Sequence, residues 1–391
     1  MKILFTQDAL INAGAEKSHL EIISRFSAET EASLVYFYPR HDLRESYQRA
    51  GIRLFFLDIP ESYHFPLAIS RLVRLIRLEK PDLIVSCLWR ADIITRIASL
   101  LTGVPLVGTL VNDSYSPISW TDKVGLKYRL VYWLDRLTSS IPVHWIANAK
   151  SIAKSHIKTL GIKEENISVV YRGRPVIGSG AKQSQWKYKS SNEETASSPR
   201  RIAVTPRSIR KFISYGRLLE RKGFQDAIRA FSELVKSYPD CTLTILGEGP
   251  FRLDLEALII KLGLENQVKL PGQLSDPTAL LPTAHCFLFP SWYEGFSGSL
   301  IEAMMAGIPI IASDIPMNLE AIQDQESAFV FPVADPRALA DQMLFAIQNP
   351  EKMFELGRKA REVAIQNFDI EVIAKQYERR LIEIFSLQKS V

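Results

Sequence analysis

The chain of 391 residues has few of the side chains that build disulfide or zinc sites. Its three cysteines, Cys87, Cys241 and Cys286, are odd in number and far apart. They match neither a disulfide framework nor the paired spacing of a zinc site, so we expect three core thiols in a reducing cytoplasm. No Asp-x-Asp motif and no cluster of histidines with carboxylates stands out either. We therefore predict that the protein requires no metal and no cofactor.

Long apolar runs and a strong net charge are also lacking. No run reaches the roughly 18 apolar residues that a membrane-spanning helix needs. The apolar run after Met1 is too short for a signal peptide and indicates a first β-strand. The net charge is a mild +5, which suits a phosphate-bearing ligand or an anionic membrane surface without singling out either. Because no nucleic-acid-binding motif accompanies this charge, we expect no nucleic-acid partner.

The sequence offers instead short apolar runs that alternate with helical patterns. Runs typical of strands lie at 3–5, 34–38, 54–57, 83–86, 106–109, 144–147, 167–170, 212–215 and 243–246. Such alternation predicts an α/β fold with parallel sheets and helices on both faces. Ligands of these sheets bind at the carboxyl ends of the strands, so the loops at those ends are the places to search for a site.

The most informative stretch, residues 287–320, combines a buried strand, a glycine-rich loop and a helix start. The strand ends at Pro290, and Ser299 can cap the following helix with Glu302 completing a capping box. Gly307 and Pro309 then end the helix. The unpaired backbone N–H groups and the dipole at such a helix start form an anion site.

Two glutamates, Glu294 and Glu302, lie beside this predicted anion site. Glu294 stands in the loop and Glu302 inside the helix, while Gly295 and Gly298 allow a phosphate to approach the backbone closely. In one interpretation both carboxylates contact a ligand. In the other, Glu302 only caps the helix and Glu294 is a solvated loop residue.

A second charged turn follows the strand at 212–215 and runs from Gly216 to Gly223. It carries Arg217 and Lys222, five residues apart. A diphosphate leaving group requires such charge neutralisation, with arginine forking onto two oxygens and lysine acting as a point charge. The alternative is that both are solvated residues of an ordinary turn.

These motifs together resemble the retaining glycosyltransferases of family 4, which have the GT-B fold. Residues 294–302 resemble their E-x7-E signature, and residues 216–223 resemble their G-R-L-x-x-x-K-G motif. The resemblance implies two Rossmann-like, doubly wound α/β domains that face a cleft. It places an acceptor-side domain at 1–178, a linker at 179–208 and a nucleotide-sugar domain at 209–368, with a C-terminal helix at about 369–391 packing back on the first domain.

The resemblance also implies roles for individual residues. Glu294 is expected to contact the donor sugar and Glu302 the ribose, while Arg217 and Lys222 stabilise the leaving diphosphate. The expected donor-binding residues are Gly14, Gly216, Gly247, Leu270, Pro271, Gly295, Phe296, Ser297, Gly298, Ser299, Leu300 and Glu302. Gly14 belongs to a loop similar to the family's G-G-A-E loop, in which Ala13 replaces the first glycine. An ordinary strand-to-helix turn is the alternative for that loop.

The acceptor-side candidates are Trp89, Arg90, Asn112 and Asp113. An exposed Trp–Arg pair suits stacking and hydrogen bonding to a sugar, but Trp89 in the core and a local ion pair between Arg90 and Asp92 explain the same residues. Many relatives have a histidine where this chain has Asn112 and Asp113, which leaves the identity of the donor sugar open.

The expected activity is retaining transfer of a sugar from a UDP- or GDP-linked donor to a hydroxyl of a glycan or lipid-linked acceptor, in cell-surface polysaccharide synthesis. The alternatives are a non-catalytic GT-B partner subunit and a nucleotide-sugar epimerase or hydrolase. We expect a cytoplasmic protein that contacts the inner face of the membrane peripherally.

Two basic amphipathic segments, 71–80 and 120–137, bear on that membrane contact. The second places Leu126, Leu130, Trp133, Leu134 and Leu137 at helical spacing. We favour helices that pack these stripes on their own sheet. The alternative for both segments is a helix that rests its basic side on a membrane, which in 120–137 is the side with Lys127, Tyr128 and Arg129.

Overall fold

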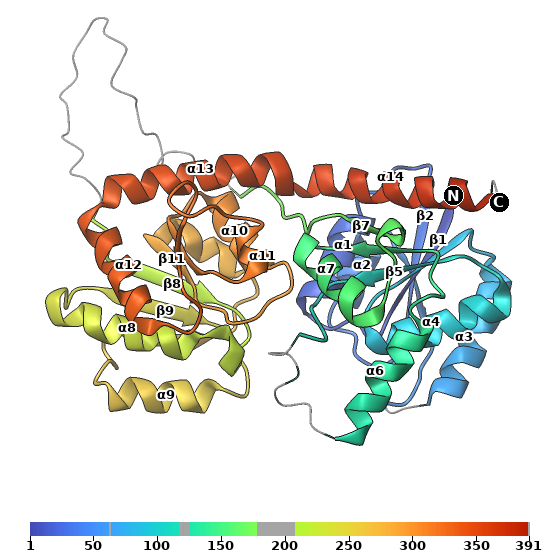
Figure 1. The fold of residues 1–391 in the computed structure, drawn as a ribbon, viewed down its shortest axis with the longest axis horizontal. Helices are drawn as coiled ribbons and strands as arrows, with labels where there is room; N and C mark the ends of the chain where they lie inside the picture. The colour runs from blue at the N-terminus through green and yellow to red at the C-terminus, as the bar shows by residue number, and fades with distance from the viewer. Residues whose placement is uncertain (62–63, 117–119, 121–124, 178–207, 390–391) are drawn as a thin grey trace, which may run out of the picture. The chain divides into compact units, whose positions relative to one another are not determined.

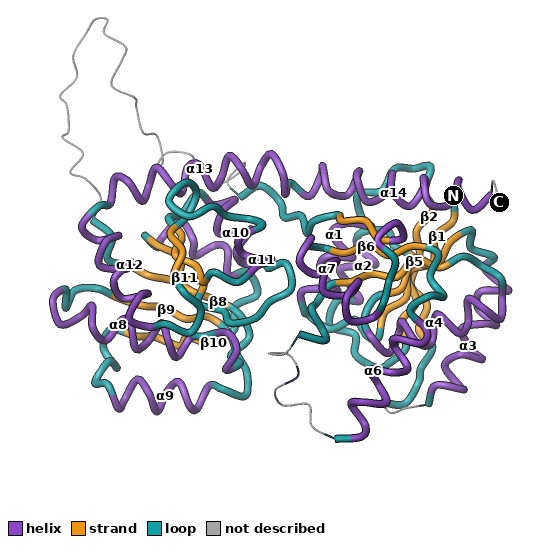
Figure 2. The backbone as a smooth tube through the Cα atoms, in the orientation of Figure 1, coloured by secondary structure: helices purple, strands orange, loops and turns teal. Residues whose placement is uncertain are grey.

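The computed structural model describes residues 1–61, 64–116, 120, 125–177 and 208–389 (Figures 1 and 2). The linker predicted at 179–208 therefore lies, apart from residue 208, outside the described residues. Contacts along the chain divide it into two compact units. The first unit comprises Met1–Arg174, Tyr293–Gly298 and Asn367–Val391, and the second comprises Pro175–Trp292 and Ser299–Gln366.

The first unit contains a seven-stranded sheet in the order β3-β2-β1-β4-β5-β6-β7. All its strand pairs are parallel. The strands are β1 (Lys2–Gln7), β2 (Glu31–Tyr36), β3 (Arg53–Phe56), β4 (Leu83–Ser86), β5 (Leu106–Leu110), β6 (His144–Ala147) and β7 (Ile167–Val169). Each one overlaps a predicted apolar run, and β4, β5 and β6 bury every residue, as expected of strands covered on both faces.

Helices cover both faces of this sheet (Figure 1). They are α1 (Gly14–Ile23), α2 (Arg44–Arg49), α3 (Phe65–Glu79), α4 (Trp89–Thr102), α6 (Leu126–Thr138), α7 (Lys150–Leu160) and the C-terminal α14 (Ile370–Lys389). One core includes Ile370, Tyr377 and Leu381 of α14 together with β1 and β2 residues. The Glu378 carboxylate also accepts the Ser27 backbone N–H at 3.0 Å, so α14 belongs to the first unit by both packing and hydrogen bonding.

The second unit repeats the architecture with a six-stranded parallel sheet in the order β10-β9-β8-β11-β12-β13. Its strands are β8 (Lys211–Tyr215), β9 (Thr242–Leu246), β10 (Val268–Gly272), β11 (Cys286–Phe289), β12 (Ile310–Ser313) and β13 (Phe329–Phe331). Its helices are α8 (Phe224–Ser237), α9 (Arg252–Lys261), α10 (Gly298–Ala306), α11 (Pro316–Leu319), α12 (Pro336–Gln348) and α13 (Pro350–Phe368). The two Rossmann-like α/β halves confirm the predicted fold class.

The three cysteines are free and buried, as predicted. The basic run at 71–80 also packs as expected, because Leu72 and Ile76 of α3 are buried in a core cluster. Within the described parts of the chain, no helix combines the length and the apolarity that crossing a membrane requires.

The preferred interpretation of segment 120–137 is wrong. Its helix, α6, turns its apolar stripe away from the sheet, with side chains that are exposed by 71% (Leu126), 61% (Leu130), 51% (Trp133), 36% (Leu134) and 72% (Leu137). The buried residue is the polar Asp135, whose carboxylate pairs with the buried Arg96 at 2.6 Å. A buried guanidinium needs a charged partner, and this requirement fixes which side of α6 faces inward.

Candidate nucleotide-sugar site

The turn after β8 presents the two predicted cations. Arg217 is exposed and Lys222 half-buried at the end of a short 3₁₀ helix, Glu220–Lys222. Between them, the buried Leu218 donates its backbone N–H to the Glu248 carbonyl at 2.9 Å. The turn is thus anchored to the end of the neighbouring strand β9, while its charged side chains stay accessible.

Gly223 closes this turn in a conformation that suits only glycine. Its φ is +66°, and a Cβ there would overlap the carbonyl oxygen of Pro290, at the end of β11. The same two segments are joined by the Trp292 backbone N–H, which donates to the Arg221 carbonyl at 2.8 Å. Close backbone approach therefore fixes the cation-bearing turn against the strand end that leads to Glu294.

The turns after β8 and β9 meet the end of β10 at the same edge of the sheet. Gly216 donates its N–H to Leu246 at 3.0 Å, and Gly247 donates to Gly272 at 2.8 Å. In β10, Leu270 is half-buried and its carbonyl accepts the Arg252 guanidinium at 2.8 Å, while Pro271 is exposed. These predicted residues come together because carboxyl ends of parallel strands share one edge.

Helix α10 starts at this edge as well, at Gly298. Ser299 therefore lies inside the helix, so the prediction that it caps the helix is wrong. Glu302, near the start of the helix, accepts the hydroxyl of the buried Tyr215 at 2.8 Å. Tyr215 ends β8, two residues before Arg217. This bond links α10 to the end of β8, the strand that the cation-bearing turn follows.

The loop with Glu294 packs within the first unit, against the predicted Asn112–Asp113 loop. The Tyr293 hydroxyl donates to the Asp113 carbonyl. A Cβ on Gly295 would overlap the Val111 carbonyl oxygen, so only glycine fits there. Glu294 itself is half-buried. The structure thus brings together Glu294 and Asn112–Asp113, which are far apart in the sequence.

Three aromatic rings support the same loop. Phe296 is 1% exposed, and its ring centroid lies 4.9 Å from that of Tyr171 and 5.3 Å from that of Phe368. Ser297 and Gly298 are buried beside it, with the Arg174 guanidinium against Gly298. Phe296, Ser297 and Gly298 therefore hold the loop in place through buried contacts. On α10, Ser299 is half-buried and Leu300 is buried.

Trp89 and Arg90 start α4 at the carboxyl end of β4. Arg90 contacts Asp8 at 3.4 Å and lies 4.3 Å over the Tyr38 ring. Arg90 therefore pairs with Asp8 and not with Asp92, which lies 4.0 Å from Arg96. Trp89 is half-buried, and its indole N–H has no partner among the described residues.

A cluster of charged residues around the Gly14 loop was not predicted from the sequence. Gly14 is exposed at the start of α1, beside the Arg172 guanidinium. The buried Glu16 follows, and burial raises its pKa to about 7, an effect that Asp8 increases and Arg172 opposes. Burial also raises the pKa of Asp8. Asp8 could have been predicted as a site residue, because it directly follows β1. The proximity of Arg172 to Gly14 could not, because it arises only when the chain folds.

Within the described residues, no group of three or more His, Cys, Asp or Glu side chains is placed to hold a metal ion. The prediction that no metal is required remains a prediction.

Comparison with known families assigns both halves of the chain. The model "Glycosyltransferase Family 4" matches residues 13–176, and the model "Glycosyl transferases group 1" matches residues 200–363. Between them they match most of the chain.

Individual relatives agree with this assignment. An uncharacterized glycosyltransferase of Methanocaldococcus jannaschii is 29% identical over 62% of this chain and 58% of its own length. The capsular polysaccharide biosynthesis glycosyltransferase CapM of Staphylococcus aureus is 22% identical over 80% of this chain and 79% of its own length. The match to the Methanocaldococcus jannaschii protein and to three further curated relatives spans only 41% to 64% of the length of each relative.

Solved structures support the fold. The crystal structure of HepE from Anabaena in complex with UDP superposes with a TM-score of 0.79 at 22% identity, covering 98% of this chain and 100% of that one. With two parallel-sheet Rossmann-like halves, a family model matched to each half and this structural likeness, the chain belongs to the group 1, family 4 glycosyltransferases of the GT-B fold.

Proposed function

We propose that the protein is a retaining glycosyltransferase that moves a sugar from a UDP- or GDP-linked donor to a hydroxyl of a glycan or lipid-linked acceptor, in cell-surface polysaccharide synthesis. Family membership supports the reaction class, and the name of CapM supports the polysaccharide setting. The structures of HepE with UDP and with UDP-glucose support a nucleotide-sugar donor.

The observation that carries the proposal is the hydrogen bond between Tyr215 and Glu302. It holds a turn with two cations and the start of α10 at one edge of a parallel sheet. In the proposed reaction, the bond between the anomeric carbon and the diphosphate oxygen breaks, and its electron pair goes to the diphosphate. The acceptor hydroxyl oxygen forms the new bond to the anomeric carbon, and its proton goes to the departing diphosphate. Arg217, Lys222 and the amides at Ser299 stabilise that added charge, so no metal is required.

The other residues take the roles that the family resemblance implies. Glu302, oriented by Tyr215, binds the ribose, and Glu294 contacts hydroxyls of the donor sugar. The turns with Gly216 and Gly247 and the strand end at Leu270 and Pro271 surround the nucleotide. The same resemblance assigns the Gly14 loop to the donor diphosphate.

On the acceptor side, we assign Trp89, Arg90, Asn112 and Asp113. The contact of the Asp113 carbonyl with Tyr293 supports this assignment, because it links the loop directly to the segment with Glu294. With a lipid-linked acceptor, the proposal includes a cytoplasmic protein in peripheral contact with the inner face of the membrane.

Turnover with a panel of UDP- and GDP-sugars, with and without membrane extract, tests the proposal. We expect nucleotide release from one donor class only when the extract supplies an acceptor. Release without acceptor would indicate a hydrolase, and binding without turnover would indicate a non-catalytic partner subunit.

A variant pair tests the role of Glu294 separately. Glu294→Gln should abolish turnover while the unfolding temperature stays unchanged. Glu326→Gln, an exposed carboxylate of the second unit, is the matched control and should keep full activity. Undiminished turnover of Glu294→Gln would refute the role assigned to Glu294.

A further inference from the structure

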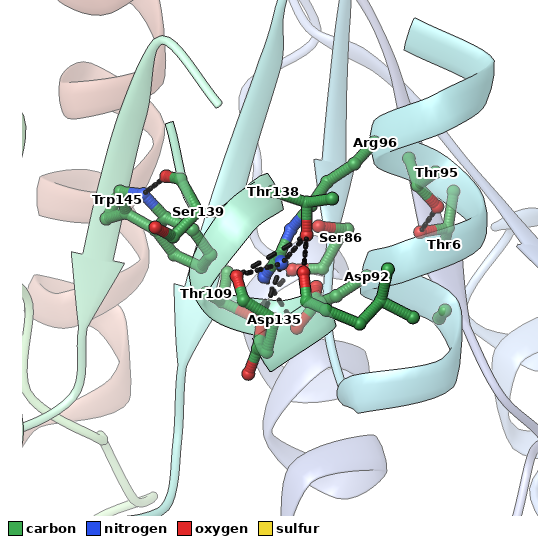
Figure 3. Close-up of polar contacts among 12 residues, drawn as sticks. Thr6, Ser86, Asp92, Thr95, Arg96, Thr109, Asp135, Thr138, Ser139 and Trp145 are labelled. Atoms are coloured by element: carbon green, nitrogen blue, oxygen red, sulfur yellow. Dashed lines mark hydrogen bonds and ion pairs between the residues drawn. The ribbon is translucent and has the colours of Figure 1, made fainter. Parts of the chain in front are cut away.

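Helix α6 is amphipathic, but it is turned the opposite way from a helix that packs its apolar side on a core. Its polar side faces the protein, where Arg96 donates to the Asp135 carboxylate at 2.6 Å and to the Thr138 hydroxyl at 2.8 Å (Figure 3). The Tyr132 hydroxyl reaches the Thr159 carbonyl on α7 at 2.8 Å. These buried polar contacts fix the rotation of the helix about its axis, because turning it would separate the buried Arg96 guanidinium from Asp135, its nearer carboxylate partner.

The opposite side of α6 carries a continuous apolar stripe that is open to solvent. The stripe consists of Leu126, Leu130, Trp133, Leu134 and Leu137, which are between 36% and 72% exposed. At about 100° per residue these five positions fall on one face of a helix. Figure 1 places α6 at the periphery of its unit, beside α4. Exposed apolar side chains gathered in this way mark an interaction site.

The charged side chains that α6 itself places beside the stripe are positive. Lys127 and Arg129 are exposed and, by helical geometry, flank the stripe on its two sides. The helix contains one acidic residue, Asp135, and that residue is buried against Arg96. An outward face with leucines, a tryptophan and basic side chains on both borders is the pattern of a helix that lies in a membrane interface.

We propose that this face of α6 docks the protein on an anionic lipid bilayer. The leucines and Trp133 enter the boundary between head groups and acyl chains, where tryptophan is favoured. Lys127 and Arg129 extend to the lipid phosphates, with attraction from the negative surface. A second copy of the chain is a poorer occupant, because two such faces in contact would bring the basic borders of both helices together. The proposal goes beyond sugar transfer and assigns a surface to the membrane contact.

Flotation of the full-length protein with lipid vesicles tests the docking face. We expect the protein to float with vesicles of phosphatidylcholine mixed with phosphatidylglycerol. With vesicles of phosphatidylcholine alone, it should remain in the dense bottom fraction. The double variant Leu130→Ser/Trp133→Ser should bind the anionic vesicles at least about tenfold more weakly, given the apolar area that it removes. Because the replaced side chains are exposed, its unfolding temperature should match that of the unmodified protein.

The matched control lies on α9 of the second unit. Leu253 and Ile260 are 76% and 65% exposed, and Leu253→Ser/Ile260→Ser should leave flotation unchanged. The assay contains no donor sugar, so its outcome is independent of the proposed transferase activity. Failure of the protein to float, equal binding to neutral vesicles or an equal loss in the α9 variant would overturn the proposal. So would a dimer in solution that Leu130→Ser/Trp133→Ser converts to monomers.

Discussion

The indole N–H of Trp292 donates a 2.6 Å hydrogen bond to the carboxylate of Asp226. Asp226 is 4% exposed in the first turn of α8, and Trp292 follows β11. Burial raises the pKa of Asp226, which the indole bond and Arg229 oppose. Together with the backbone bond from Trp292 to Arg221, this contact joins the segment that contains Lys222 to the segment that leads to Glu294.

A double-mutant cycle measures this contact. Asp226→Ala leaves the indole N–H without its acceptor and should lower the free energy of unfolding by about 1–3 kcal/mol. Trp292→Phe should cost a similar amount because the buried carboxylate loses a donor. The double variant should cost less than the sum, with a coupling of about 1 kcal/mol or more in urea unfolding. Strictly additive costs would show that the bond contributes nothing.

Gly223 provides a test of the backbone contact beneath the cation-bearing turn. Gly223→Ala and Gly263→Ala both place a side chain at positive φ, +66° and +67°, which costs about 1–2 kcal/mol. Only at Gly223 does the new Cβ meet the Pro290 carbonyl, whereas nothing lies within 4 Å at Gly263. We expect Gly223→Ala to lower the free energy of unfolding by about 1–3 kcal/mol more than its control. Equal losses in urea unfolding would contradict the close approach.

His19 predicts a loss of stability at acid pH. It is 5% exposed, lies 3.1 Å from the Gln7 amide, and burial with help from Arg172 lowers its pKa to about 4. The unfolded chain binds this proton near pH 6.5 and the folded protein only near pH 4. The stability that the neutral ring contributes is therefore present above about pH 6.5 and is lost as the pH falls toward 4.

The comparison with His19→Gln isolates this effect. The free energy of unfolding of the unmodified protein, relative to that variant, should fall by up to about 3 kcal/mol between pH 6.5 and 4. The exposed His64 is the control, and His64→Gln should show the same pH dependence as the unmodified protein. A difference between protein and His19→Gln that stays constant over this range would mean that His19 is not held neutral.

The sequence was sufficient to locate the seven strands of the first unit, and β8, β9, β11 and the two cations of the second unit, whereas β12 and β13 were not predicted. Strands buried on both faces are continuous apolar runs, and Arg217 and Lys222 follow such a run directly. The contacts that depend on distant residues were not predictable in the same way. Asp135 faces inward because of Arg96, 39 residues earlier, and Glu302 is held by Tyr215, 87 residues earlier.

The error over α6 has the same origin. Helical periodicity shows that five apolar residues share a face, but it does not show which face the rest of the protein covers. The partner of Arg90 was missed for a similar reason, since Asp8 lies 82 residues away at the end of another strand.

The central claim is that a diphosphate binds where the start of α10 meets Arg217 and Lys222, and titration calorimetry with UDP and GDP tests it most directly. One of these nucleotides should bind, and Arg217→Ala and Lys222→Ala should each weaken it by about 10- to 100-fold, since each removes a charge-assisted contact. Arg221→Ala, from the same turn, should bind like the unmodified protein, and the corresponding monophosphate should be less sensitive to the two replacements. If both variants bind the diphosphate as tightly as the unmodified protein, the diphosphate does not bind at this edge.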